Sequence, residues 1–393
     1  HHEPSRRQRQ MCIRDSADAD PANELQTLSI SDDTLFISDG NNVTLPGASG
    51  LSQQLAGLDT LADELSLAGS FALGGNPSDL FVLGDYAYVM VPENGEMVII
   101  NIADPENPAL SGTYQFPVDT HSLIQVVGTT AYMMGDSSLI SVDISDPANP
   151  TFIDGADAVD GTHPVFDAFF VIDSVAYVGD IANGLIEILE LSPPSYTWGD
   201  DISISNPGRL FADANHIYVI ETGGPLHIID RTTKATTGTL TLSGNPSDLF
   251  VLNDYAYITN GGTNELQIVN ISDPANPVLT GSVSVGSSGS VYVQGSHAYI
   301  GSNQLIVVDV SIPSSPVLDE SFSLGATPEA VHVQGNYAYV ANQDNDELEI
   351  IDIAFFTQTA YSVSLDAAGN AVLAQNIWQN DGPDIYNANS ANV

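Results

Sequence analysis

The sequence predicts an all-β fold, a seven-bladed β-propeller, from three observations. A strand-rich unit of about 40 residues recurs seven times, turn residues separate its short strands, and no apolar run is long enough to span a membrane. Two copies of the unit are nearly identical, because residues 75–88 and 244–257 differ at one position in fourteen. A period of this length with only β signals is typical of propeller blades.

A tyrosine that follows a small or apolar residue marks each unit. Successive tyrosines lie 44, 45, 41, 39, 42 and 40 residues apart. This near-constant spacing indicates seven equivalent units between residues 66 and 354. The seven tyrosine anchors are Tyr88, Tyr132, Tyr177, Tyr218, Tyr257, Tyr299 and Tyr339.

Each unit divides into four short strands. An apolar run such as 80–83 suits an inner strand that neighbouring blades cover. A Gly-Asp or Asn-Asp turn leads to the tyrosine-bearing strand, and a hairpin then leads to a third strand of the pattern LxIxD. A DPxNP turn such as 273–277 precedes the outer strand, since proline removes a ladder donor and Asp caps the turn. Two units depart from this pattern: the third ends its third strand in Leu189, and the fourth has RTTK at 231–234.

The ring is expected to close through the strand that precedes the first unit. The last unit ends near Ala354 without a fourth strand, whereas residues 65–73 resemble one. Pairing of that segment with the last blade would remove an open sheet edge that promotes aggregation.

The order of motifs within each unit resembles that of the LVIVD-repeat family of β-propellers: a tyrosine-bearing strand, then an LxIxD strand, then a DPxNP turn. The resemblance covers all seven units. It implies the propeller fold and usually a surface or extracellular location, and it implies no particular reaction.

The charge balance excludes several classes of partner. Fifty acidic residues oppose seven basic ones, which gives a net charge of −43, and after Asp15 only Arg209, Arg231 and Lys234 are basic. Such a surface repels nucleic acid and anionic lipid, so we expect no nucleic-acid partner and no membrane insertion. The only cysteine is Cys12, and the cysteine-free remainder suits an extracellular protein that needs no disulfides.

Four segments flank the repeats. Residues 1–16 are expected to be a foreign, disordered leader without the apolar stretch of a signal peptide, and a short basic arm is the alternative. Residues 17–47, which include two alternating strands around a turn, predict a short β module. Residues 48–65 predict a helical linker, and residues 355–393 predict a C-terminal β extension with a hairpin tail.

Both flanks resemble parts of tail-fibre-like and surface proteins of marine bacteria and their phages. The segment LSISDDTLFISDGNNVTLP and the polar stretch at 377–393 carry this resemblance, which implies a fragment of a longer protein that is extracellular, on the cell surface or virion-associated. The apolar residues of 51–65 recur at spacings of four and three. They predict either one amphipathic helix on the propeller or an oligomer formed as a trimeric stalk.

Charged side chains around the central channel form the candidate ligand site. Propeller geometry places the start of each first strand and the hairpin after the second strand on one face. This rim could bind a cation or a sugar, and its single arginine could pair with Asp79 or Asp248 or anchor an anion. The candidate residues are Asp79, His121, Asp167, Arg209, Asp248 and Glu329.

The main expectation is that the protein needs no cofactor, and calcium is the alternative. Asp/Asn-rich turns offer the oxygen ligands that calcium prefers, and Asp344, Asp346 and Glu347 form the densest cluster. However, no EF-hand loop occurs, and the DPxNP turns recur once per blade, as expected of turn formation.

The sequence contains no GxSxG elbow, phosphate loop or HExxH motif. The leading hypothesis is therefore a non-enzymatic extracellular interaction or adhesion propeller within a larger surface or fibre protein, with a surface glycan or a protein as its ligand. A carbohydrate-active hydrolase or lyase that uses the acidic rim is one alternative. A structural spacer is the other.

Overall fold

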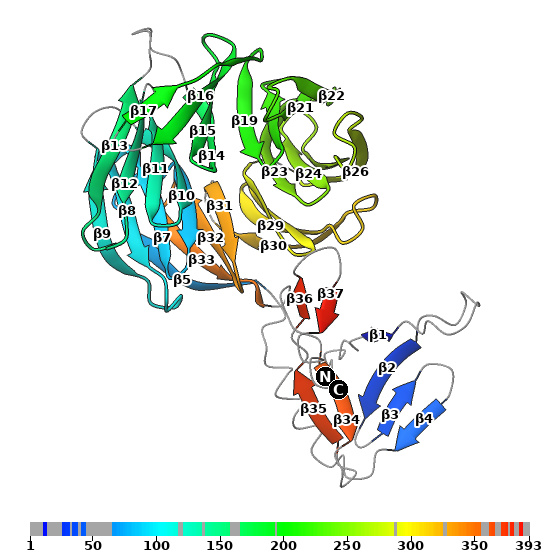
Figure 1. Cartoon of the computed structure of the whole chain (residues 1–393). Helices are drawn as coiled ribbons and strands as arrows, with labels where there is room; N and C mark the ends of the chain where they lie inside the picture. Colours follow the sequence, from blue (N-terminus) through cyan, green and yellow to red (C-terminus); the bar gives the residue numbers. More distant parts are fainter. Residues whose placement is uncertain are drawn as a thin grey trace. The chain divides into compact units, whose positions relative to one another are not determined.

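The computed structural model confirms the seven-bladed propeller, in which seven antiparallel sheets are arranged around one channel (Figure 1). These sheets lie in one compact unit, Glu64–Thr357. Within the repeats, the structure describes residues 65–116, 121–135, 138–157, 166–192, 195–286, 289–324 and 328–354.

Each blade begins with a strand that lies along the channel and a second strand that pairs with it on the outer side, and the blades are numbered 1 to 7 along the chain. The first strands are β6 (Asp79–Leu83), β10 (His121–Val127), β14 (Phe166–Ile172), β19 (Pro207–Ala212), β23 (Pro246–Leu252), β27 (Val291–Gln294) and β31 (Pro328–Gln334). The second strands, which carry the tyrosine anchors, are β7 (Tyr86–Val91), β11 (Thr130–Gly135), β15 (Val175–Asp180), β20 (His216–Glu221), β24 (Tyr255–Asn260), β28 (His297–Gly301) and β32 (Tyr337–Asn342).

Two further strands complete each blade on its outer side. The third strands are β8 (Glu96–Asn101), β12 (Ser138–Asp143), β16 (Leu185–Ser192), β21 (Leu226–Asp230), β25 (Glu265–Asn270), β29 (Gln304–Asp309) and β33 (Glu347–Asp352). The outer strands are β9 (Ala109–Gln115), β13 (Thr151–Asp157), β17 (Ser195–Trp198), β22 (Thr236–Leu240), β26 (Val278–Ser284), β30 (Val317–Ser323) and β5 (Ser66–Ala72). Blade 3 adds β18 (Ile202–Ser203), and a 3-10 helix, η1 (Pro92–Asn94), joins β7 to β8.

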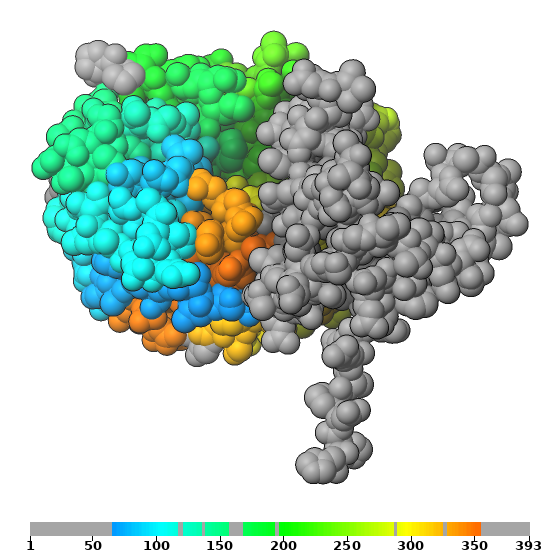
Figure 2. Space-filling view, turned by 90° about the horizontal axis from the view of Figure 1, so that it is seen from below, coloured from blue at the N-terminus to red at the C-terminus, as the bar shows by residue number. Residues whose placement is uncertain are grey.

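The predicted closure of the ring is confirmed. Strand β5 pairs antiparallel with β33, from Ser66 opposite Asp352 to Ala72 opposite Glu347. The first part of the propeller (blue) and its last part (orange) therefore lie side by side on the surface in Figure 2. The last blade takes its outer strand from the opposite end of the chain.

The hydrophobic core lies between blades. One apolar cluster joins Leu80 and Val98 of blade 1 to Ala330 and Tyr339 of blade 7. Six of the seven tyrosine anchors are buried in such clusters, and Tyr132 is half-buried. Because each blade covers the faces of its two neighbours, the first and second strands must be apolar, as their sequences are.

The DPxNP turn has a local cause in its Asp and Asn. In blade 1, the Asp104 carboxylate accepts hydrogen bonds from the Glu106 backbone N–H at 3.3 Å and from Asn107 Nδ2 at 3.0 Å. In blades 2 and 5, the turn asparagine also donates to the turn aspartate, at 2.9 Å in each case. These bonds stabilise the turn before the outer strand begins.

The third and fourth blades differ from the others, as their sequences predict. In blade 3, two short strands, β17 and β18, pair with different parts of β16. In blade 4, the Asp230 carboxylate accepts hydrogen bonds from the backbone N–H groups of Thr232 and Thr233. The Arg231 guanidinium then reaches back to blade 3, where it contacts the Tyr177 hydroxyl and the Asp173 carboxylate, each at 3.0 Å.

Short strands also occur in the flanks. They are β1 (Met11–Ile13), β2 (Gln26–Ser31), β3 (Thr34–Ile37), β4 (Asn41–Thr44), β34 (Tyr361–Leu365), β35 (Ala371–Gln375), β36 (Trp378–Asn380) and β37 (Ile385–Asn387). The two strands expected in the N-terminal module correspond to β2 and β3. Strand β1 lies within the leader, which was expected to be disordered, and it pairs with β2. Residues 48–64 of the linker lie outside the described residues, so the amphipathic helix and the trimeric stalk both stay predictions for the apolar pattern of 51–65. Among the described helices, none has the length and apolarity needed to cross a bilayer.

Candidate functional site

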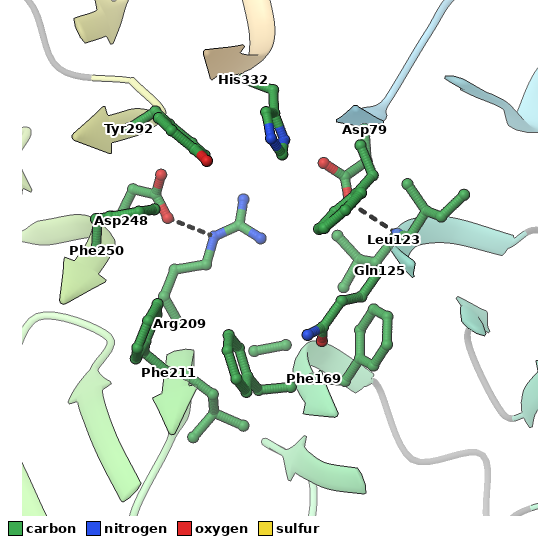
Figure 3. Close-up of a pocket in the computed structure, with 15 residues that line it drawn as sticks. Asp79, Leu123, Gln125, Phe169, Arg209, Phe211, Asp248, Phe250, Tyr292 and His332 are labelled. Carbon is green, nitrogen blue, oxygen red and sulfur yellow. Dashed lines mark hydrogen bonds and ion pairs between the residues drawn. The ribbon is translucent and has the colours of Figure 1, made fainter. Parts of the chain in front are cut away.

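A cavity of about 330 Å³ occupies the channel where the first strands begin (Figure 3). Its upper level consists of the residue nine positions before each tyrosine anchor, and we call these seven residues the mouth tier. Those of blades 1 to 5 line the cavity. The mouth tier is Asp79, Leu123, Ala168, Arg209, Asp248, Ser290 and Ala330.

Two positions further along each first strand lies a second level, which we call the aromatic tier. All seven of its residues line the cavity, and five pairs of neighbouring rings have centroids between 4.5 and 5.7 Å apart. Side chains alternate between strand faces, so residues two apart both point into the channel. The aromatic tier is Phe81, Gln125, Phe170, Phe211, Phe250, Tyr292 and His332.

Arg209 is the only basic residue that lines this cavity. Its Nε lies 3.4 Å from Asp248 Oδ1, so the structure pairs it with one of the two aspartates considered from the sequence. The guanidinium extends into the space between Asp79, Asp248, Tyr292 and His332 (Figure 3). Its side chain is 41% exposed, and within the described residues neither Nη atom forms a hydrogen bond.

The two aspartates of the mouth tier also connect neighbouring blades. Asp79 Oδ2 accepts a hydrogen bond from the Ile124 backbone N–H of blade 2 at 2.8 Å, and Asp248 Oδ2 accepts one from the Val291 N–H of blade 6 at 2.7 Å. In blade 2, Gln125 has the same role toward blade 3, since its amide bonds both the N–H and the C=O of Val171.

Burial controls the protonation of these groups. Desolvation raises the pKa of Asp79 to about 6, although backbone hydrogen bonds and the nearby Arg209 oppose the shift. Desolvation also raises the pKa of Asp248, again against Arg209. His332 is 8% exposed, and desolvation lowers its pKa to about 3, so its imidazole is neutral at ordinary pH.

A second hollow of about 390 Å³ adjoins the mouth tier, and polar and apolar residues line it in similar number. Leu123 and Arg209 line both spaces, so Arg209 lies between this outer compartment and the aromatic inner one. The outer compartment is lined by Ser122, Leu123, Gly208, Arg209, Ile220, Thr222, Asn245, Pro246 and Ser247.

The structure brings together three of the six candidate rim residues, Asp79, Arg209 and Asp248. The positions of the others differ by one or two residues in register from the mouth tier. Glu329 is exposed one position before Ala330, and His121 is fully buried, with its ring 5.0 Å from that of Phe116. The side chain of Asp167 lies outside the described residues.

The candidate calcium ligands lie at the hairpin of blade 7. Among the described residues, no three His, Cys, Asp or Glu side chains gather as metal ligands, and Asp344, Asp346 and Glu347 are therefore not brought together as such a group. Asp346 has a φ of 54°, its backbone C=O accepts a hydrogen bond from the Leu73 N–H at 2.7 Å, and its carboxylate accepts one from the Asn76 amide at 2.6 Å when that amide takes its flipped orientation. This contact indicates a role in holding the hairpin.

Sequence reasoning missed the aromatic tier, although a signal for it was present. The residue seven positions before each tyrosine anchor is Phe in four blades and Tyr, His or Gln in the other three. The apolar character of the first strands hides this position. An alignment of the seven units on their tyrosines shows that it is selectively aromatic.

Comparisons with known proteins agree with the repeat assignment. The LVIVD repeat matches residues 74–115, 122–156, 243–285, 285–323 and 328–357, which are blades 1, 2, 5, 6 and 7. The unmatched blades are the two that depart from the pattern. No curated protein matches the chain.

Among solved structures, the chain resembles other propellers at low identity. The Cps50 (Swd1) β-propeller domain of Myceliophteria thermophila is 10% identical with a TM-score of 0.63, and the match covers 73% of this chain and 99% of that one. Virginiamycin B lyase from Staphylococcus aureus is 9% identical with a TM-score of 0.58, and the match covers 74% of this chain and 99% of that one. At such identities the likeness concerns the fold alone. The chain is thus a seven-bladed β-propeller that contains LVIVD repeats.

Proposed function

We propose that the chain is a non-enzymatic interaction domain of an extracellular surface or fibre protein and that its channel mouth binds a glycan. One observation carries this proposal: the Arg209 guanidinium projects into the cavity with its Nε held by Asp248 and both Nη groups available. The acid-rich composition and the resemblance of the flanks support the extracellular setting.

The lining of the cavity suits a sugar ring. Hydroxyl groups need both donors and acceptors, which Arg209 and the aspartates Asp79 and Asp248 supply. The aromatic tier offers ring faces, whose negative charge density attracts the polarised C–H groups on one side of a pyranose. A volume of about 330 Å³ can hold one such ring.

The hydrogen bonds of the two aspartates favour binding over catalysis. Each carboxylate accepts a backbone N–H of the next blade, so each has a structural role in holding adjacent blades together. A glycosidase instead needs two carboxyl groups that face the scissile bond. The pKa of Asp79, about 6, nevertheless lies in the range of a general acid, and it keeps a hydrolase or lyase as the second candidate.

A glycan array probed with the full chain tests this function. Arg209→Gln should abolish the signal. Lys234→Gln should retain it, because this substitution removes the same positive charge from a residue that pairs with Asp200 outside the cavity. Melting curves of both variants would check that they fold. Absence of any bound glycan, or equal binding by both variants, would refute the proposal. Cleavage of a bound glycan that Asp79→Asn stops would favour the enzyme.

A further inference from the structure

The polar groups of the cavity leave more donors than acceptors for a ligand. Asp79 accepts hydrogen bonds from the Leu80 and Ile124 N–H groups, and Asp248 accepts one from the Val291 N–H and pairs with Arg209. Their acceptor capacity is therefore partly used within the protein. A ligand that fits this balance must itself be rich in acceptors.

Two donors of the aromatic tier add to Arg209. The Val82 backbone N–H donates to His332 Nδ1 at 3.3 Å, and a neutral imidazole that accepts at Nδ1 carries its proton on Nε2. The ring of Tyr292 packs against that of His332 with centroids 4.5 Å apart. Within the described residues, neither the Tyr292 hydroxyl nor His332 Nε2 forms a hydrogen bond, so both can donate to a ligand.

Arg209 presents a specific shape to the ligand. Because Asp248 contacts its Nε, the outer edge formed by Nη1 and Nη2 faces the cavity. Two parallel N–H groups on a planar guanidinium match the two oxygens of a carboxylate, which a single hydroxyl or amide cannot do.

We infer that the ligand is a sugar that carries a single carboxylate, a terminal uronate, with its acid group on the Nη edge of Arg209 and its ring against the aromatic tier. This inference rests on the proposed glycan function and specifies its ligand class. A polymer of uronates fits poorly, because its further charges would meet a protein with a net charge of −43.

The charges that surround the bound acid predict its dependence on pH. Among the residues that line the cavity, Arg209, Asp79, Asp248, Tyr292 and His332 can titrate, and the last two are neutral at pH 5.5–7.5. The pKa of Asp79 is about 6, so acidification to pH 5.5 removes a negative charge near the site. A uronate, with a carboxyl pKa of about 3.5, stays ionised. Binding should therefore tighten as the pH falls through 6.

Matched pairs of small sugars test this inference on the full chain. Saturation-transfer NMR titrations would compare the methyl glycosides of glucuronate, galacturonate and mannuronate with those of glucose, galactose and mannose. We expect at least one uronide to bind about tenfold more tightly than its neutral partner. Arg209→Lys, which keeps the charge but loses the planar edge, should reduce that preference to about twofold, and Lys234→Gln should leave it unchanged.

The outcomes separate the two proposals. Equal binding of each acidic and neutral pair, or a preference that Arg209→Lys does not reduce, would overturn the uronate inference and leave the glycan function in place. Binding on the array only to sugars without a carboxylate would do the same. If the array and the titrations both show no sugar bound, the glycan function fails and the inference fails with it.

Discussion

The close approach between neighbouring blades predicts that one added methyl group destabilises the ring. In the outer strand of blade 1, a Cβ on Gly112 would overlap the carbonyl oxygen of Pro147 in the DPxNP turn of blade 2, well inside the 3.0 Å within which real Cβ atoms essentially never approach another heavy atom. That oxygen belongs to the backbone, so it cannot rotate away. The same contact recurs in three other blades, at Gly69, Gly238 and Gly281.

The residue types at this position agree with the contact. Blades 2 and 6 have Asp154 and Glu320 there, and in each case the next blade lacks a DPxNP-like turn. A side chain is thus present where no turn approaches, and glycine is present where one does. The glycine is required by the neighbouring blade and not by its own backbone conformation.

Two opposing terms determine the effect of Gly112→Ala. Alanine in a strand is normally more stable than glycine by about 0.5–1 kcal/mol, because it loses less backbone entropy on folding. Forcing apart two packed backbones typically costs about 1–3 kcal/mol. We expect the overlap to win and to lower the free energy of unfolding by about 1–2 kcal/mol. For a domain of this size, that is a fall in melting temperature of about 2–3 °C.

Urea and thermal unfolding, followed by circular dichroism, would measure this change. Gly155→Ala is the matched control, because its added Cβ would meet the Ile140 side chain at 3.2 Å and the Leu139 carbonyl oxygen at 3.3 Å, both within its own blade and both beyond 3.0 Å, and no turn of the next blade. The free energy of unfolding of the control should lie within about 0.5 kcal/mol of that of the parent protein. If Gly112→Ala is as stable as Gly155→Ala, the proposed contact between blades is not a constraint on the fold.

Three further predictions concern closure, channel packing and pH. Deletion of residues 65–73 exposes the edge of β33 and should give aggregated protein; a soluble monomer with an unchanged melting temperature would contradict closure. Gln125→Leu leaves the buried N–H and C=O of Val171 unpaired and should lower the unfolding free energy by about 1–3 kcal/mol in urea titrations; an unchanged midpoint would count against this bond. Burial lowers the pKa of His332 to about 3, so the unfolded chain binds a proton that the folded chain does not, and stability is lost as the pH falls from 6.5 toward 3. As the pH falls from 6 to 4, the free energy of unfolding of His332→Phe should therefore rise relative to that of the parent protein by about 1.4 kcal/mol per pH unit. A difference in unfolding free energy that stays constant with pH would show that this histidine titrates normally.

The sequence by itself determined the repeat, the number of blades and the closing strand. These features depend on local patterns, namely the spacing of tyrosines, alternating apolar strands and a turn whose Asp and Asn bond to each other. The strands and turns could be inferred because each is complete within one unit of about 40 residues, and the blade number and the closing strand follow from counting the units and finding the last one a strand short. Even the departures of blades 3 and 4 were visible as missing motif residues.

Only the tertiary structure decided which side chains meet in the channel. Asp79, Arg209 and Asp248 come from three blades, and a shift of one residue along a strand turns a side chain to its other face, as it does for Glu329 relative to Ala330. The tyrosine anchors set the register of equivalent positions among the units, but which of those positions point into the channel is decided only when the sheets pack around it. The aromatic tier exists for the same reason, since seven residues, each about 40 positions from the next, form a ring only when the sheets close around a common axis.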